Sequence, residues 1–165
     1  MAGLARFRGS ELVETWRVLV DPEDHYEQLY HSDLHGIREQ HTSEASTFPE
    51  IHPLLKHFLA KELCIFHAAS GFDRECLRKA CERYALENVT TSAWLSTLEL
   101  AHEQWPQEAP YKLERLCENI GHDYLPHNAL EDTIAAAAVF RSLSGSTPFV
   151  PVMDTIWLSA ATRTK

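Results

Sequence analysis

The sequence predicts one α/β domain in which a mixed sheet is flanked by helices. Three observations lead to this fold class. The chain opens with two segments of near-alternating polarity, which is typical of paired strands. A short, wholly apolar run then lies between two segments of helical periodicity, as expected of a strand buried on both faces. Helical patterns fill most of the remaining chain, and this order of elements is characteristic of layered α/β proteins.

The first half of the chain supplies three strands and two helices. Strands are expected at Leu4–Phe7 and Leu12–Val20, and the polar stretch that follows to Ser46 is expected to be mostly loop. A helix then begins at a capping-box pattern, Thr47-Phe-Pro-Glu. A loop of small residues separates the buried strand from the next helix. The strand is expected at Leu63–Phe66 and the helix from about Phe72 to Tyr84.

The second half is expected to be mainly helical, after a short strand around Trp94. Helices are expected at Thr97–Trp105, Lys112–Ile120 and Ala129–Leu143. Pro106 stops the first of these helices, and Gly121 closes the second. We expect one domain over residues 1–143 and a separate C-terminal tail over 144–165.

Composition narrows the class of protein. The chain has 165 residues, of which 44% are hydrophobic, and this suits one globular domain. No run approaches the ~18 apolar residues of a membrane span, and the N-terminus has no secretory pattern. We therefore expect a cytoplasmic protein with no membrane partner. The net charge of −9 argues against coating nucleic acid by bulk attraction, yet it is compatible with carboxylates that hold divalent cations.

Several passages, in a consistent order along the chain, resemble one enzyme family. Ile65–Asp73 is similar to a strand followed by His-Asn-small-small-Phe-Asp, and Pro126–Asp132 is similar to a His-x4-Asp motif. Further matches are Leu34–Ile37, Ser46–Ile51, Trp94–Leu98 and Tyr111–Cys117. The family is that of the DEDDh-type 3′→5′ exonucleases, and the resemblance is greatest to the proofreading subunits of bacterial replicative polymerases. It implies a ribonuclease H-like fold.

The resemblance also implies a reaction and residues that carry it. The family hydrolyses phosphodiesters with two divalent ions, Mg²⁺ or Mn²⁺, which are held by four carboxylates. Asp73 and Asp132 match the two later carboxylates, and His127 matches the general base. Each has an ordinary alternative, since an aspartate near a helix start is favourable by itself and a loop histidine can simply be exposed.

The implied substrate is the 3′ end of single-stranded DNA or RNA. In this family apolar and aromatic side chains contact the terminal bases. His35, Ile37 and Phe72 match such positions, with core packing as an equal alternative.

The family's first motif, Asp-x-Glu, is not at its expected place. It lies on a central strand that precedes the counterpart of Leu4–Phe7, and this chain begins a few residues before that segment. The letters Asp21-Pro-Glu fall in a turn instead. We hypothesise that the apolar tail segment Phe149–Leu158 supplies a replacement strand and that Asp154 supplies one carboxylate, although Ile156 stands at the glutamate position. Alternatively, the tail packs on the surface, or a second copy or a partner chain completes the sheet.

Three functional interpretations follow. In the first, the chain is a 3′→5′ exonuclease, either active or weakened by the missing first motif. Alternatively, it is a catalytically inactive relative that serves as an interaction or nucleic-acid-binding module. In the third interpretation, the chain is a fragment of a protein that carries the first strand upstream.

Overall fold

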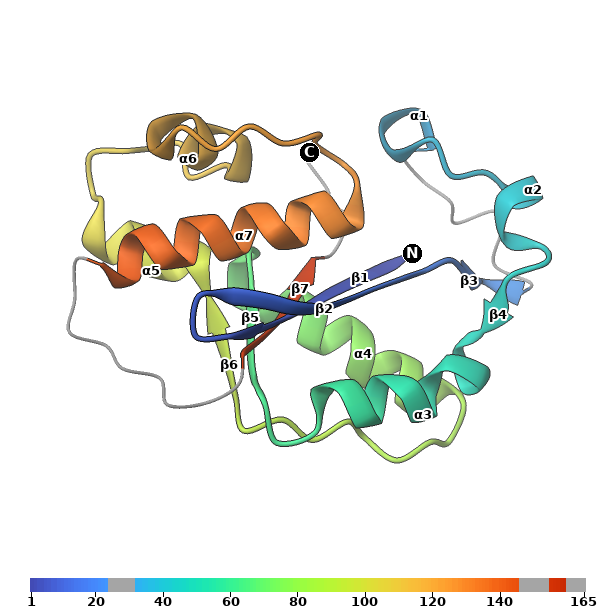
Figure 1. Ribbon diagram of the computed structural model, residues 1–165. Helices are drawn as coiled ribbons and strands as arrows, with labels where there is room; N and C mark the ends of the chain where they lie inside the picture. Colours follow the sequence, from blue (N-terminus) through green and yellow to red (C-terminus); the bar gives the residue numbers. More distant parts are fainter. Residues whose placement is uncertain (24–31, 146–154, 160–165) are drawn as a thin grey trace.

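The computed structural model describes residues 1–23, 32–145 and 155–159, the last of these through its backbone alone. Its centre is a five-stranded sheet of order β2-β1-β7-β5-β6 (Figure 1). The strands are β1 (Ala2–Arg8), β2 (Glu11–Val18), β5 (Leu63–Phe66), β6 (Ala93–Ser96) and β7 (Thr155–Ser159). β1 is antiparallel to β2 and β7, whereas β5 is parallel to β6 and β7. The predicted mixed sheet is therefore confirmed.

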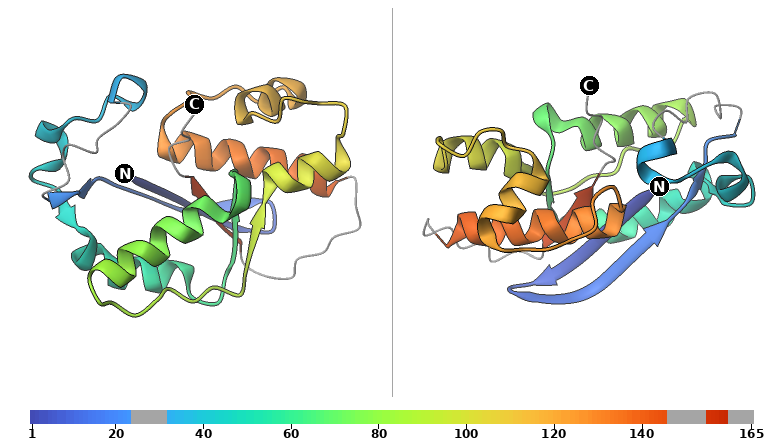
Figure 2. Two further views of the ribbon diagram at one scale, coloured as in Figure 1. Left: turned by 180° about the vertical axis from the view of Figure 1, so that it is seen from behind. Right: turned by 90° about the horizontal axis from the view of Figure 1, so that it is seen from above.

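Helices cover both faces of this sheet (Figures 1 and 2). One face carries α3 (Phe48–Leu59) and α4 (Phe72–Arg83). The other face carries α5 (Thr97–Gln104), α6 (Leu113–Ile120) and α7 (Ala129–Ser144). No helix in the described ranges is long and apolar enough to cross a membrane.

The apolar run of β5 is explained by burial on both sides. Cys64 and Phe66 pack into a cluster with residues of α3, whereas Leu63 and Ile65 pack against Ala136 and other residues of α7. Because successive side chains of a strand point to opposite faces, a strand between two helical layers needs apolar residues at every position.

A smaller structure lies beside the main sheet, where the sequence had suggested mostly loop. It pairs β3 (Val20–Asp21) with β4 (Ser46–Thr47) in parallel and includes two short helices, α1 (Ser32–His35) and α2 (Glu39–Thr42). The turn after β3 holds Glu23 at φ 55°, and its N–H donates to Asp21 Oδ1 at 2.8 Å. The Asp-Pro-Glu letters thus form a local turn, as predicted.

The start of α7 is fixed to the sheet through Gly3. A Cβ at Gly3 would lie only 2.5 Å from the carbonyl of Ala129, so the helix approaches the strand as closely as backbone permits. Thr133 Oγ1 lies 3.2 Å from the Gly3 carbonyl and 2.6 Å from the Ala129 carbonyl, and can donate to either. The small residues of α7 let it lie close to the sheet, and this contact positions the residues that precede the helix.

The C-terminal strand β7 lies at the centre of the sheet, between β1 and β5. Its first residue, Thr155, pairs with Leu63 at the start of β5, and Leu158 pairs with Phe66 at the end of β5. The tail segment named in the sequence hypothesis therefore includes a central strand, although Asp154 lies outside the described residues. The division of the chain at residue 143 stays a prediction.

Candidate nucleotide-binding site

A cavity of about 400 Å³ opens at the carboxyl ends of β5 and β6, beside the start of α7. Four segments contribute to it: the turn after β5, the start of α5, the start of α6 and the loop that leads into α7. Its lining residues are His67, Ala68, Ala69, Phe72, Leu98, Tyr111, Lys112, Leu113, Glu114, Tyr124, Pro126, His127 and Asp132. Three of the residues singled out in the sequence, Phe72, His127 and Asp132, thus lie in one cavity.

His127 and Asp132 are held together by the cap of α7. Asn128 is the N-cap, and its side-chain oxygen accepts from the N–H of Leu130 at 3.2 Å. The backbone N–H of His127 donates to Asp132 Oδ1 at 3.3 Å. His127 has φ 65°, a left-handed conformation that is uncommon for residues other than glycine and is often found at functional sites.

Asp132 is almost inaccessible to solvent although it borders the cavity. Its residue exposure is 6%. Burial raises its pKa to about 6, and the hydrogen bond from His127 opposes this rise. A buried carboxyl with a raised pKa gains from a nearby positive charge, so this group is suited to hold a cation or a proton.

His67 is a structural member of the cavity wall. Its Nε2 lies 3.1 Å from the carbonyl oxygen of Tyr111, which can only accept, so we assign the proton to Nε2. Nδ1 then accepts from the Thr97 hydroxyl, 2.8 Å away. Burial lowers the pKa of His67 to about 4, and the ring is neutral at physiological pH. It therefore links β5, α5 and the segment before α6 without carrying charge.

Asp73 occupies the first turn of α4, one residue beyond Phe72, and does not line the cavity. Its Oδ2 is buried and has no hydrogen-bond partner. Burial raises the pKa of this carboxyl to about 7. An orphaned, buried carboxylate oxygen is costly, and its presence indicates that the site favours a proton or a cation there.

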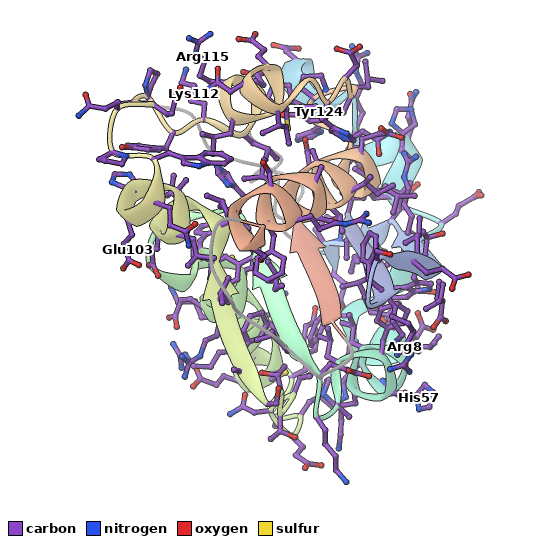
Figure 3. All side chains as sticks on the ribbon, turned by 60° about the vertical axis from the view of Figure 1, so that its left-hand side comes forward. Arg8, His57, Glu103, Lys112, Arg115 and Tyr124 are labelled. Carbon is purple, nitrogen blue, oxygen red and sulfur yellow. The ribbon has the colours of Figure 1, made fainter. Side chains whose placement is uncertain are left out.

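Sequence reasoning matched the stretch around Tyr111 and Lys112 to the family but gave these residues no role. Of the lining residues in the described part of the chain, Lys112 alone carries a fixed positive charge. Tyr124 lines the same cavity, and burial raises the pKa of its hydroxyl. Lys112 and Tyr124 lie on the α6 side of α7 together with Arg115, remote from Arg8 and His57 (Figure 3). The only sequence signal for Lys112 was its place in the matched stretch Tyr111–Cys117.

The structure does not bring His35 and Ile37 to the cavity. Both lie at the end of α1, where His35 Nδ1 accepts from the N–H of Ile37 at 3.0 Å. Neither is among the lining residues, whereas Phe72 is and has 38% of its surface exposed. A role of His35 and Ile37 in substrate binding stays a prediction.

The residues present do not fit a complete centre for two divalent ions. Hard cations take six or more oxygen ligands, and a two-ion centre needs several carboxylates. Within residues 1–23, 32–145 and 155–159, no group of three or more His, Cys, Asp and Glu side chains is placed to hold a metal ion. Asp132 and Glu114 are the carboxylates that line the cavity, and Asp73 does not border it.

Comparison with known proteins identifies the family. A family profile described as Exonuclease (RNase_T) matches residues 3–140, which is most of the chain. The chain belongs to the exonuclease family. The match includes the cavity, His127 and Asp132, and it accords with the fold expected from the sequence. This family generally uses divalent metal ions. No curated protein sequence matches the chain significantly.

Solved structures agree on the fold. One is described as 3′-end specific recognition of histone mRNA stem-loop by 3′-exonuclease, and another as a full-length 3′-exonuclease. Each is 20% identical to this chain, with a TM-score of 0.66, and the alignment covers 82% of this chain and 66% of the other. This exonuclease-family chain therefore has the ribonuclease H-like fold and spans just under two thirds of the length of those proteins.

Proposed function

We propose that this chain is a 3′→5′ exonuclease-like domain that binds the 3′-terminal nucleotides of a single-stranded nucleic acid in the cavity. The observation that carries the proposal is the convergence of Phe72, His127 and Asp132 on one cavity at the carboxyl ends of parallel strands. Such crevices are the usual ligand sites of α/β sheets.

The chemistry of the cavity suits a terminal nucleotide. Phe72, Tyr111 and Tyr124 supply aromatic surface, on which bases stack without regard to sequence. Lys112 supplies a positive charge for a phosphate. The carboxyl of Asp132 has its pKa raised to about 6, so it approaches neutrality in mildly acidic solution and repels the phosphate less. Binding should therefore strengthen as pH falls from 8 to 6.

Hydrolysis by the two-metal route is the reaction that the family implies, with Mg²⁺ or Mn²⁺ as cofactor. His127 would accept a proton at the cavity, and Asp73 and Asp132 would contribute ligands. Because no group of three or more metal-ligating side chains lies together in the described residues, we propose that this chain alone binds a 3′ end but hydrolyses it slowly. The alternative is that the chain catalyses no hydrolysis and serves only as a binding module.

Binding is tested by fluorescence anisotropy with short single strands of DNA and RNA in EDTA. An oligonucleotide with a free 3′ end is compared with a circular single strand of the same composition. Lys112→Ala should weaken binding of the linear strand several-fold. Lys79→Ala, which removes the same charge from an exposed side chain of α4 outside the cavity, should not. Equal affinity for linear and circular strands would refute 3′-end recognition.

Turnover is tested separately with 5′-labelled strands and either Mg²⁺ or Mn²⁺. The wild-type chain and Asp132→Asn are compared at equal concentration. A contaminating nuclease would shorten the strand in both samples. Shortening from the 3′ end by wild type alone establishes an enzyme. No shortening by either, together with 3′-end binding, establishes the binding module.

A further inference from the structure

Strand β6 forms one edge of the main sheet (Figure 1). Among the described strands, β5 alone pairs with it. The N–H of Ser92 donates to the carbonyl of Glu62 at 2.8 Å, so the backbone of Ser92 faces the segment that leads into β5. Backbone groups alternate between the two sides of a parallel strand, and the N–H groups of Ala93 and Leu95 therefore point outward. Such an edge is a template for a further strand.

A groove follows this edge on the side of α4. It consists of two hollows, of about 470 and 450 Å³, which share Arg74 and Arg78 of α4 and Trp94 of β6. The first hollow reaches Ser92, just before β6, and the second reaches Ser96 at its end. The groove therefore runs along the whole of β6. A groove between a helix and an edge strand is a geometry that accepts an extended peptide as an added strand.

The charge of the first hollow is positive. The charged residues that line it are Arg74 and Arg78. Arg78 is held by two acidic neighbours on α4: its Nε and Nη2 donate to Glu75 at 2.8 and 2.6 Å, and its Nη1 donates to Glu82. Arg74 is exposed and forms no ion pair within the described part of the chain. An acidic group that enters the first hollow would therefore gain a guanidinium that no other carboxylate shares.

The second hollow distinguishes a peptide from a nucleic acid. Glu75 and Glu99 line it together with the two arginines, so its charges balance. A nucleic acid carries a negative charge at every nucleotide and would meet both carboxylates. A peptide can place an acidic side chain beside Arg74 and an uncharged one beside Glu99. Its backbone also offers donors and acceptors in turn, as an edge strand requires, whereas a phosphate only accepts.

We propose that the groove between α4 and β6 binds an extended acidic segment of a partner protein, which adds to the sheet as a strand beside β6. An acidic side chain of this segment lies near Arg74. Apolar side chains at every second position contact Trp94 and Leu77, which pack against the same core cluster. The groove shares no lining residue with the cavity proposed for the 3′ end, so the two sites are independent.

The probe is a library of random octapeptides displayed on phage and selected on the full chain. The enriched sequence is then synthesised with a fluorophore and measured by anisotropy. We expect acidic residues, apolar residues at alternate positions, and a Kd of about 10–100 µM, as for small transient interfaces. Arg74→Ala should weaken binding about fivefold, whereas Lys79→Ala, an exposed residue of α4 outside both hollows, should not.

Strand addition is tested through the backbone. Ala93→Pro removes one outward N–H at the first residue of an edge strand, a position that tolerates proline, and should weaken binding about tenfold or more. Methylation of the peptide's own amide nitrogens, one at a time, should reduce affinity at alternate residues only. Amide exchange followed by NMR should slow at Ala93 and Leu95 when the peptide binds. The last two measurements use the unaltered chain, so they do not depend on how a variant folds.

Several results would overturn the proposal. They are a selection that enriches no acidic sequence, equal affinity for wild type and Arg74→Ala, and amides of Ala93 and Leu95 that are already protected in the free chain. Self-association that Ala93→Pro abolishes would assign the edge to a second copy. Binding of a short DNA single strand that Arg74→Ala abolishes would assign the groove to nucleic acid. The peptide assays contain no nucleic acid, so their failure is distinct from failure of 3′-end binding.

Discussion

Asp73 makes the sharpest prediction, because its carboxyl is buried with one oxygen unpaired. We expect Asp73→Asn to be more stable than wild type at pH 8 and less stable than wild type at pH 4. The change removes the charge and keeps the shape of the side chain. Its effect on the free energy of unfolding should therefore change sign within this range.

The magnitude follows from the pKa of Asp73, which burial raises from 3.8 to about 7. Stability from such a group is fully present below the unfolded pKa and is lost as pH rises through the folded pKa. At ~1.4 kcal/mol for each pKa unit, the loss by pH 8 is at most ~4 kcal/mol. A buried amide brings its own unpaired N–H groups, which cost ~1–3 kcal/mol at every pH. The variant should thus gain about 1–3 kcal/mol at pH 8 and lose a similar amount at pH 4.

Urea unfolding followed by tryptophan fluorescence measures this difference at pH 4, 6 and 8. EDTA keeps cations from occupying the site. Asp123→Asn, in the exposed loop before α7, controls for the loss of one negative charge and should shift stability little at any of these pH values. If the difference between Asp73→Asn and wild type is the same at pH 4 and pH 8, the Asp73 carboxylate is not desolvated and the reasoning is refuted.

Three further predictions concern other parts of the site and are checked by the same unfolding assay. Burial lowers the pKa of His67 from 6.5 to about 4, so its contribution to stability is present above pH 6.5 and is lost towards pH 4, by at most ~3 kcal/mol. His67→Gln should reduce this loss of stability between pH 6.5 and pH 4. An unchanged loss would contradict the neutral ring. Gly3→Ala should cost about 1–3 kcal/mol because its Cβ meets the Ala129 backbone, whereas Gly145→Ala, with its nearest atoms at 3.6 Å, should be neutral or stabilising. His127→Val should cost ~1–2 kcal/mol at φ 65° and His127→Asn almost nothing; equal costs would show that the left-handed conformation is not retained.

Secondary structure and family could be predicted here because their signals are local or repeated along the chain. The Thr47 capping box starts α3, and the Thr47 N–H donates to Glu50 Oε2 at 2.7 Å. Gly121 ends α6 at φ 67°, and Asn128 caps α7 just after the predicted histidine. Each of these depends on residues within one or two turns, so the letters alone are sufficient.

Contacts between distant segments could not be predicted in this way. Nothing in the letters around His67 indicates that its ring bridges Thr97 and the carbonyl of Tyr111, residues 30 and 44 positions away. Asp73 and Phe72 are neighbours in sequence, but only Phe72 borders the cavity, because successive residues of a helix point about 100° apart. Lys112 enters the site through the path of the loop before α6, which has no local signature.

For strand β7, composition and the position of single residues differ in how well the sequence predicts them. Apolar composition was enough to nominate the C-terminal tail as a strand, since any strand at the centre of a two-sided sheet needs apolar residues on both faces. The face of the sheet on which a single position lies is harder to predict, because it depends on the register of β7 with β1 and β5. Position 156, which matches the motif's glutamate position, pairs with Cys64 of the cluster on the α3 side of the sheet. A motif carries chemistry only through the face and the end of the strand on which it falls, and the letters of β7 alone predict neither.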